Sequence, residues 1–389
     1  MYPFMIKDPF SRTVAIAGVG ESECGKGVGM SVLQHQALAA KRALDDAGLS
    51  KNDVDAVMAT DVCGLPSLQV AEYLGIKPQY TDTTITGGSA FEGFVEHGAL
   101  AIAAGLCEVG LITYGSSLWS DHRRLVEQGG VDPRMPAAQF EMPYGDLSPI
   151  AAYALAAQRH MHKYGTTSEQ LAEVAVASRQ WAMHNPRALL REPITTADVV
   201  RSPLVASPFH KLDCCLMTDG GGAVVITSTE RARDLRKPPV YVIGSGFSAT
   251  HLTVNQMDDL TVTGAVTSGR RAFARAGLKP NDIDLLQIYD SFTFSVVVAL
   301  EDLGFCEKGE GGHFVENGRL GPGGELPTNT SGGGLSYTHP GALGLFLIIE
   351  AVRQLRGECA DRQVPDAQLA LVHGIGGWLS AHATLILGI

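Results

Sequence analysis

The sequence lacks any apolar run close to the roughly twenty residues that a membrane-spanning helix needs. Its N-terminus has no basic segment followed by a long apolar stretch, which is the pattern of a secretory leader. Cysteine is sparse and irregular: the seven thiols are an odd number without regular spacing, and Cys214 and Cys215 are adjacent. This usage is typical of reduced thiols. Together these absences predict a cytoplasmic protein.

Positive charge is also in short supply. Lysine and arginine number 30 against 41 acidic residues, which gives a formal net charge of −11. An excess of negative charge repels nucleic acid and anionic membranes, so neither is expected as the principal partner, although a local basic pocket for phosphates stays compatible with it. The 389 residues, 45% of them hydrophobic and 45 of them glycine, predict an enzyme-sized protein with closely packed α/β layers.

Two glycine-led segments stand out. In the segment from Leu326 to Leu355 a glycine triplet precedes His339 and Pro340. Glycine lets the main chain approach a ligand, and a proline after the histidine fixes the turn that aims the imidazole. A glycine-rich surface loop with an incidental histidine is the alternative. The earlier segment, Thr86 to Leu106, has the same form: a glycine pair, a small polar residue, then His-Gly-Ala-Leu leading into an apolar helix.

The clearest sign of duplication lies before each glycine-led segment. Ala47–Asp61 matches Ala276–Asp290 with nearly the same offset as the glycine-led pair. The simplest account is two homologous halves, each with the order helix, loop, strand, glycine-rich turn and helix. The charged, proline-ending stretch Arg231–Pro239 is the predicted boundary, which gives halves at 1–235 and 236–389.

Short apolar runs predict the buried strands, and one helix carries clear caps. The helix has Ser31 as its N-cap and Gly48 as its stop. The strands are expected at 13–18, 54–59, 109–114, 220–227 and 240–243. The polar, proline-containing stretch after Ser116 is too long for a simple connection and continues into helical patterns, so a functional insertion over a site is predicted at about 116–200.

Four motifs together carry a resemblance to a known family. They are the paired Ala-Gly-Leu…Asp-Val/Ile-Asp segments, Tyr289-Asp-Ser-Phe292, Asn329-Thr-Ser-Gly-Gly-Gly334 with His339-Pro340, and the closing stretch Gly374–Ser380. Over almost the whole chain they resemble the thiolase superfamily. The resemblance is nearest to sterol-carrier-protein-X-type thiolases, often labelled lipid-transfer or acetyl-CoA acetyltransferase proteins, and to steroid side-chain aldolases.

The resemblance implies several properties. The fold would be α/β: a duplicated, five-layer αβαβα thiolase-like fold. The assembly would be a homodimer or a dimer of dimers, and the substrates acyl-CoA thioesters, with coenzyme A entering only as part of the substrate and no other cofactor or metal. Related aldolases look as if they work with a small zinc-ribbon/OB-fold protein, so a partner of that kind is possible.

The family's two catalytic cysteines are missing. In a catalytic thiolase the nucleophilic cysteine stands on the first glycine-rich turn at a helix N-terminus, where the dipole and backbone amides lower its pKa. Matching that turn places Ser89 there, and a serine needs a dedicated base to ionise. The second cysteine, which serves as acid and base, matches Gly374. The resemblance therefore argues against ordinary thiolytic acyl transfer.

Two other positions keep functional side chains. His339 matches the family's Gly-His-Pro histidine, which would help to build an oxyanion hole or act as a base. Tyr289 stands where thiolases carry Asn-Glu-Ala-Phe or His-Asp-Ala-Phe, and this Tyr-Asp form resembles the side-chain aldolases. A phenol can donate to an oxyanion or take a proton. The structural alternative is a core tyrosine at a strand end. Asp290 reads as a local cap, and His373 either faces the site or packs.

A histidine, a tyrosine and an oxyanion hole without a thiol favour retro-aldol cleavage of a β-hydroxyacyl-CoA, because that reaction needs no acyl-enzyme. The candidate catalytic residues are Tyr289, His339 and Ser89. The candidate substrate-binding residues, which lie on the glycine-rich turns, are Gly88, Gly333, Gly334, Tyr337, Gly376 and Gly377. The alternatives are an acetyl-CoA acyltransferase that uses another cysteine or a His339-activated serine, and a non-catalytic acyl-CoA or lipid-binding protein. The insertion's composition does not separate steroid, aromatic and fatty acyl groups.

Overall fold

A large mixed sheet runs through the part of the molecule that the structure describes. The computed structural model describes residues 12–60, 64–121, 133–145 and 148–389. Within them, nine strands form this sheet in the order β3-β2-β4-β7-β1-β8-β11-β10-β9. The strands are β1 (Val14–Glu21), β2 (Ala56–Ala59), β3 (Tyr80–Asp82), β4 (Val109–Ser116), β7 (Gly220–Ser228), β8 (Val240–Ala249), β9 (Leu285–Ile288), β10 (Leu369–Gly376) and β11 (Ala381–Gly388). A separate two-stranded sheet pairs β5 (Leu204–Ala206) with β6 (Phe209–His210).

Apart from β3, the nine-stranded sheet consists of two halves with the same strand order. In the first half, β1 is antiparallel to β7, β7 is antiparallel to β4, and β4 is parallel to β2. In the second half, likewise, β8 is antiparallel to β11, β11 is antiparallel to β10, and β10 is parallel to β9. Two residue pairs, Ala15–Tyr241 and Ile16–Val240, join β1 to β8. The duplication expected from the sequence is confirmed, whereas the boundary near residue 235 stays a prediction.

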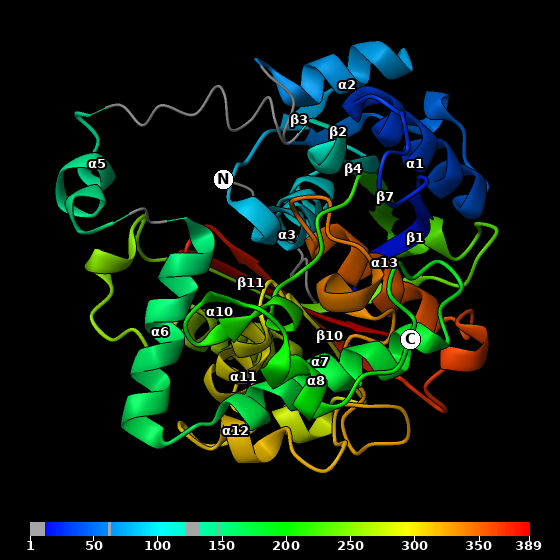
Figure 1. The fold of residues 1–389 in the computed structure, drawn as a ribbon. Coiled ribbons are helices and arrows are strands. Elements are labelled where there is room, and N and C mark those ends of the chain that lie inside the picture. The colour runs from blue at the N-terminus through cyan, green and yellow to red at the C-terminus, as the bar shows by residue number, and fades with distance from the viewer. Residues whose placement is uncertain (1–11, 61–63, 122–132, 146–147) are drawn as a thin grey trace, which may run out of the picture.

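Helices cover both faces of the sheet and also lie between its halves. They are α1 (Val32–Ala47), α2 (Pro66–Leu74), α3 (Ala90–Ala103), α5 (Pro136–Phe140), α6 (Pro149–Tyr164), α7 (Ser168–Met183), α8 (Thr196–Arg201), α9 (Thr229–Ala232), α10 (Ala265–Ala276), α11 (Thr293–Asp302), α12 (Gly311–Phe314) and α13 (Gly344–Leu355). Helix α1 packs on β1, β7 and β4, and α10 packs on β8 and β11. Helices α3 and α13 pack on each other and on strands of both halves, near the middle of Figure 1. This arrangement gives the five layers that the resemblance implies.

Glycines on the two inner strands show the duplication at atomic scale. A Cβ at Gly20 of β1 would lie 2.5 Å from the carbonyl oxygen of Ala39 in α1. A Cβ at Gly246 of β8 would lie 2.1 Å from the carbonyl oxygen of Ser268 in α10. In each half, therefore, an outer helix rests directly on strand backbone, which only glycine permits at these positions.

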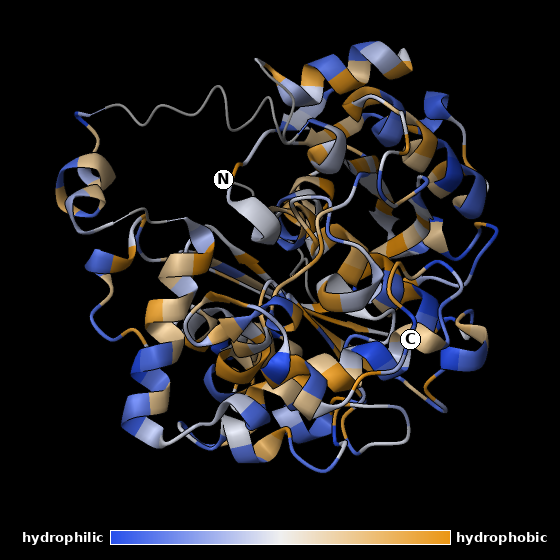
Figure 2. Cartoon of the chain, in the orientation of Figure 1, coloured by the Kyte–Doolittle hydropathy of each residue, from blue (hydrophilic) through white to orange (hydrophobic). Residues whose placement is uncertain are grey.

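The sequence predicts the capped helix well. Helix α1 begins after Ser31, whose side chain forms a capping box with Gln34, and it ends at Gly48 in a left-handed conformation with φ of 74°. Strands β1 and β8 run further than the predicted 13–18 and 240–243, because pairing with β7 and β11 extends them. Apolar residues concentrate in the central strands, and polar ones in the peripheral helices and loops (Figure 2).

One expected similarity between the glycine-led segments is wrong. Helix α3 begins at Ala90, so His97 lies inside it and pairs with Asp82 at the β3 edge. Helix α13 begins only at Gly344, after His339. The difference follows from Pro340, which has no N–H and cannot lie inside a helix, whereas no proline interrupts Ala90–Ala103. The two histidines are therefore not equivalent.

The insertion covers the C-terminal half. Helix α7 packs against α11 and against the π-helical turn Gly333–Tyr337, and α6 also contacts α11. Parts of the predicted insertion, 122–132 and 146–147, lie outside the described residues. Among the described helices, none combines the length and apolar character needed to cross a membrane.

The glycine contacts give a direct test of this packing. Gly20→Ala and Gly246→Ala should each lower the free energy of unfolding by about 1–3 kcal/mol or more, because the added methyl meets helix backbone that cannot move aside. The matched control is Gly93→Ala in α3, where the nearest atom to an added Cβ is 3.8 Å away, on Phe247. That change should instead stabilise by about 0.5–1 kcal/mol. Urea unfolding of the three variants measures the change in the free energy of unfolding and its sign. The same change in all three variants would contradict this packing.

Candidate active site

A tyrosine and a histidine from different segments meet at the sheet edge. Tyr289 directly follows β9, and its backbone N–H donates to the carbonyl of His373 on β10 at 2.9 Å. His339 follows the π-helical turn, and its N–H donates to Thr218 Oγ1 at 3.1 Å. The Tyr289 hydroxyl lies 2.9 Å from His339 Nε2, and the two rings stand at 88° to each other. The structure thus brings these two sequence-predicted residues into direct contact.

Asp290 holds the π-helical turn in place. Its carboxylate accepts hydrogen bonds from the N–H groups of Gly334 at 2.7 Å and Leu335 at 3.2 Å. A Cβ at Gly333 would lie 2.2 Å from Asp290 Oδ2, so a glycine is required there. Burial raises the pKa of Asp290 to about 7. Asp290 is therefore a cap of this turn, as its sequence context indicates, and it fixes the chain that leads to His339.

Burial keeps both members of the pair uncharged. Tyr289 is 5% exposed and His339 is 8% exposed. Desolvation raises the pKa of Tyr289 well above its ordinary value, and the nearby Cys215 adds to the rise. Desolvation also lowers the pKa of His339 to about 4. At neutral pH the phenol keeps its proton and the imidazole has a free nitrogen lone pair, so the pair can relay a proton.

The first glycine-rich turn presents Gly88, rather than Ser89, to the tyrosine. A Cβ at Gly88 would lie 2.0 Å from Cε2 of Tyr289. The Ser89 hydroxyl is fully buried and donates to the carbonyl of Thr86 at 2.9 Å. Among the described hydrogen bonds, Ser89 has none to His339 or to another base. The tyrosine ring thus fills the space in front of the turn, and Ser89 faces its own backbone.

The remaining glycine candidates are close-packed. A Cβ at Gly376 would lie 1.6 Å from the carbonyl oxygen of Thr86, so the first turn and the end of β10 touch backbone to backbone. Gly377 follows with φ of 63°. A Cβ at Gly334 would meet His339 Cδ2 at 3.3 Å. Gly334 therefore borders the imidazole, and Gly376 and Gly377 pack against the first glycine-rich turn.

Tyr337 lies in a different cluster. Its hydroxyl donates to Glu21 Oε1 at 2.9 Å. The same glutamate pairs with Arg353 at 2.6 Å and also with Arg187. These arginines hold the pKa of Glu21 at about 2 despite its burial. The structure therefore does not bring the Tyr337 hydroxyl to the Tyr289–His339 pair.

His373 packs on the other face of the sheet. Its Nδ1 lies 2.9 Å from Thr384 Oγ1, and its Nε2 lies 3.2 Å from His382 Nδ1. Successive residues of a strand point to opposite faces. The next residue, Gly374, faces α3, so His373 faces the α10 side, where Thr384 also contacts Ser268.

Sequence reasoning missed a buried carboxyl on α3. Glu92 is 1% exposed, and neither of its oxygens has a hydrogen-bond partner among the described residues. A Cβ at Gly374 would lie 2.2 Å from Glu92 Oε2. Desolvation raises the pKa of Glu92 to about 8. The sole signal in the sequence is a glutamate one helical turn after Gly88, on a helix that also carries Glu96 and His97.

Three further side chains near the pair were also missed. The Tyr114 hydroxyl, at the end of β4, donates to the carbonyl of Pro340 at 2.5 Å. Tyr153 of α6 reaches the carbonyl of Gly377 at 3.4 Å. Burial raises the pKa of Cys215 far above its ordinary value, so this thiol is protonated at neutral pH. Tyr114 ends a predicted strand, and such positions line the edge of a sheet.

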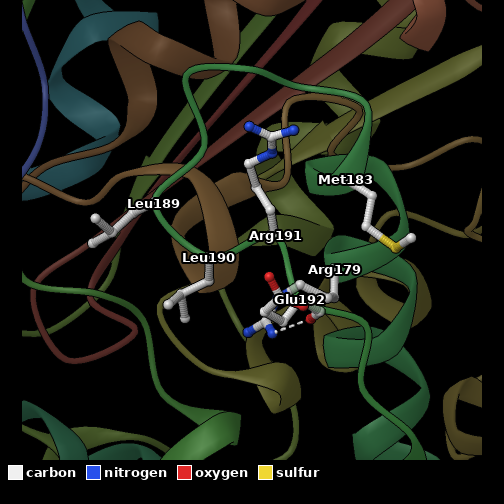
Figure 3. Close-up of a pocket in the computed structure, with 6 residues that line it drawn as sticks. All are labelled: Arg179, Met183, Leu189, Leu190, Arg191 and Glu192. Atoms are coloured by element: carbon white, nitrogen blue, oxygen red, sulfur yellow. Dashed lines mark hydrogen bonds between the residues drawn. The ribbon is translucent and has the colours of Figure 1, made fainter.

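An open cleft lies beside the π-helical turn (Figure 3). Its volume is about 580 Å³, and it is lined by Arg179, Met183, Leu189, Leu190, Arg191 and Glu192. Arg179 crosses it, donating from Nε to Ser336 Oγ at 2.9 Å and from a terminal nitrogen to the Glu192 carbonyl at 2.8 Å. The cleft borders the turn through Ser336, and neither Tyr289 nor His339 lines it. The contact geometry, not this cleft, therefore identifies the chemical centre. Within the described ranges no three potential metal ligands cluster.

Comparisons with known proteins show what the chain is similar to. A family model described as thiolase C-terminal domain-like matches residues 246–389. The acetyl-CoA acetyltransferase of Methanothermobacter thermautotrophicus is 35% identical, over 94% of this chain and 97% of the relative. A steroid side-chain-cleaving aldolase of Thermomonospora curvata is 36% identical, over 93% and 95% of the two chains. The solved structure "Ltp2-ChsH2(DUF35) aldolase" superposes with a TM-score of 0.88 at 35% identity, over 97% of this chain and 98% of that one.

The buried carboxyl predicts an unusual dependence of stability on pH. The folded protein binds the Glu92 proton with a pKa of about 8, against an ordinary value of 4.5. This contribution to stability is full below pH 4.5 and is lost as pH rises toward 8, at about 1.4 kcal/mol per pH unit. Glu92→Gln removes the titration. The free energy of unfolding is measured in urea at pH 5 and at pH 8 for both proteins. The loss between the two pH values should be smaller for Glu92→Gln than for the parent, by a few kcal/mol.

The control for this prediction is Glu350→Gln. Glu350 is buried but paired with Arg362 at 2.9 Å, so this variant should be less stable than the parent. Parallel pH dependences for the parent and Glu92→Gln would show that Glu92 does not hold its proton in the folded state.

Proposed function

The chain belongs to the thiolase superfamily, and we propose that it is a lyase that cleaves β-hydroxyacyl-CoA thioesters by a retro-aldol reaction. The observation that carries the proposal is the contact of the Tyr289 phenol with both His339 and Gly88, at a turn without a thiol. Relatives named for lyase chemistry support it. One is the aldolase of Thermomonospora curvata, and another is the 17-hydroxy-3-oxo-4-pregnene-20-carboxyl-CoA lyase of Mycobacterium tuberculosis, 38% identical over 89% of this chain.

The proposed reaction uses the neutral pair as a proton relay. The substrate's β-hydroxyl donates its proton to the Tyr289 oxygen while the phenol passes its own proton to His339 Nε2. The bond between the α- and β-carbons then breaks, and its electron pair moves onto the thioester as an enolate. An aldehyde or a ketone leaves. A proton delivered to the α-carbon completes the shortened acyl-CoA, so the reaction needs no oxidant, metal or cofactor beyond the substrate's own coenzyme A.

A conventional acyltransferase is the second candidate, because the acetyl-CoA acetyltransferase of Methanothermobacter is about as similar as the aldolase. That chemistry needs a nucleophile. Cys215 is the thiol near Tyr289, but burial keeps it protonated. Ser89 donates to the Thr86 carbonyl instead of to a base. Neither residue favours the transferase as much as the Tyr289–His339 pair favours the lyase. Binding of acyl-CoA without turnover is the third reading.

Product analysis separates these functions. The full chain is incubated with a panel of steroid, aromatic and fatty β-hydroxyacyl-CoA and β-ketoacyl-CoA thioesters, and the products are identified by mass spectrometry. A free aldehyde or ketone with a shortened acyl-CoA supports the lyase. CoA-dependent shortening of a β-ketoacyl-CoA would establish the transferase instead, and binding without either product would establish a carrier.

The proposal extends to the assembly. The similar aldolase structure is named for two components, Ltp2 and ChsH2, which supports a partner protein for this chain as well. A small protein of the zinc-ribbon/OB-fold type is proposed, because the family resemblance implies one. A homodimer or a dimer of dimers is proposed for the chain itself. The product assay is therefore run with and without added candidate partner, and light scattering measures the mass of the assembly.

Removing one hydroxyl tests the relay. Tyr289→Phe keeps the ring that packs on Gly88 but removes the proton donor, so turnover should fall about one hundredfold or more. His339→Ala removes the acceptor and should have a comparable effect. The matched control is Tyr241→Phe, which removes a hydroxyl from β8. Arg12 lies over the ring of Tyr241. Steady-state kinetics on the best substrate decides, and near-full activity of Tyr289→Phe would exclude the proposed relay.

Ser89 gives a second, independent test. Because its hydroxyl donates to a carbonyl and has no base among the described residues, Ser89→Ala should keep most of the turnover. Intact-protein mass spectrometry during turnover should find no acyl group on the parent chain. An acyl adduct localised to Ser89 would restore the transferase reading.

A further inference from the structure

Glu92 lies beside the site, and its carboxyl has no part in the Tyr289–His339 proton relay. It lies on α3, one helical turn after Gly88, and both of its oxygens are buried without a partner among the described residues. Burying a carboxyl without a partner costs about 1–3 kcal/mol or more. A group retained under this penalty at the edge of a reaction centre calls for an explanation.

Glycines on two other elements make room for this carboxyl. A Cβ at Gly374 of β10 would lie 2.2 Å from Glu92 Oε2. A Cβ at Gly344, the first residue of α13, would lie 2.6 Å from the same oxygen and 2.2 Å from the Gly88 carbonyl oxygen. The carboxyl therefore occupies the volume that side chains at 344 and 374 would fill.

The same backbone connects Glu92 to the tyrosine. Gly88 contacts the Tyr289 ring on one side and, through its carbonyl, borders Gly344 beside the carboxyl. The residue before Gly344 is Leu343, whose backbone lies close enough to the Tyr289 hydroxyl to affect its pKa. Tyr289 and Glu92 thus lie on either side of the contact between the first glycine-rich turn and the start of α13.

Position 374 adds a chemical reason. The resemblance assigns an acid/base thiol to this position, and the chain has a glycine there. Any larger side chain at 374 would collide with Glu92. An ionisable group is therefore present in that volume after all, but it comes from α3 instead of β10.

We propose that Glu92 is the general acid that delivers a proton to the α-carbon of the thioester enolate. The inference rests on the retro-aldol function proposed above. In the cleavage, Tyr289 takes the β-hydroxyl proton and passes its own proton to His339. The electron pair of the broken carbon–carbon bond takes the proton of Glu92 to form the new α-carbon–hydrogen bond. Glu92 is left as a carboxylate and His339 as an imidazolium. Proton exchange with solvent as the products leave restores both groups.

The environment of Glu92 suits this role. Desolvation is the main cause that keeps the carboxyl protonated near neutral pH, and no charged side chain contributes to its pKa from the described residues of α3, α13 or β10. A neutral carboxylic acid held by burial is a recurrent device for proton donation at pH 7. The enolate that forms beside it is a strong base, so the transfer is favourable in the direction of cleavage.

The experiment uses proton exchange at the α-carbon of a simple thioester. Propionyl-CoA is incubated with the full chain in D₂O, and deuterium incorporation is followed by mass spectrometry. By microscopic reversibility the Glu92 carboxylate removes the α-proton, so exchange by the parent should rise as pH passes about 8. Glu92→Gln, which keeps the volume but cannot take a proton, should exchange at least about one hundredfold more slowly and without this pH dependence.

Two further variants keep the test decisive. Glu92→Asp retains the acid on a shorter side chain and should restore part of the exchange, which rules out a merely structural defect. Tyr289→Phe should lose cleavage of β-hydroxyacyl-CoA but keep the exchange, because its hydroxyl acts at the β-oxygen. Circular dichroism and thermal melts establish that each variant is folded.

The outcomes separate this inference from the function on which it rests. Exchange by Glu92→Gln at the parent's rate, or no exchange by a parent chain that cleaves its substrate, would overturn the role of Glu92 and leave the lyase standing. Exchange that depends on Glu92 without any release of aldehyde or ketone would overturn the lyase, while Glu92 would remain the acid and base at the α-carbon.

Discussion

Direct contact between backbone segments is the constraint on which the site depends. The first glycine-rich turn touches the end of β10 at Gly376 and the start of α13 at Gly344, with no side chain between them. Such an approach is open only to glycine. Because these segments come from both halves of the chain, the packing of α3 against α13 in the central layer also sets the distance between their functional groups. The same duplication that builds the sheet therefore builds the site.

Close packing has an electrostatic consequence. When backbone fills the space that water would occupy, an ionisable group without a charged partner shifts toward its neutral form. The phenol of Tyr289, the imidazole of His339 and the carboxyl of Glu92 all follow this rule. Glu21 is the counterexample, since two arginines keep it ionised at similar depth. The site thus combines neutral donors and acceptors, which suits proton transfer along a short path, and places its fixed charge pairs in the supporting frame.

The sequence predicts the fold better than the site. The duplication follows from a local pattern, since Ala47–Asp61 and Ala276–Asp290 share Ala-Gly-Leu followed by Asn-Asp-Val/Ile-Asp, whereas the strand order is known only from the structure. The sequence does not predict which residue of the first turn faces Tyr289, because a shift of one position exchanges Gly88 for Ser89. Glu92 was invisible for a related reason. Its helix also carries Glu96 and His97, so the sequence does not single Glu92 out, and only the tertiary arrangement shows that glycines on β10 and α13 surround it.

The glycines at 88 and 374 leave room for the side chains that face them. A side chain at 88 would need the space that the Tyr289 ring occupies, and one at 374 would need the space of the Glu92 carboxyl. Neither position can take a side chain by a single substitution unless Tyr289 or Glu92 moves aside. The tyrosine and the first turn are therefore coupled, as are the glutamate and β10, and each pair has to change together. A single change at either glycine therefore first disturbs the packing that supports both halves of the site.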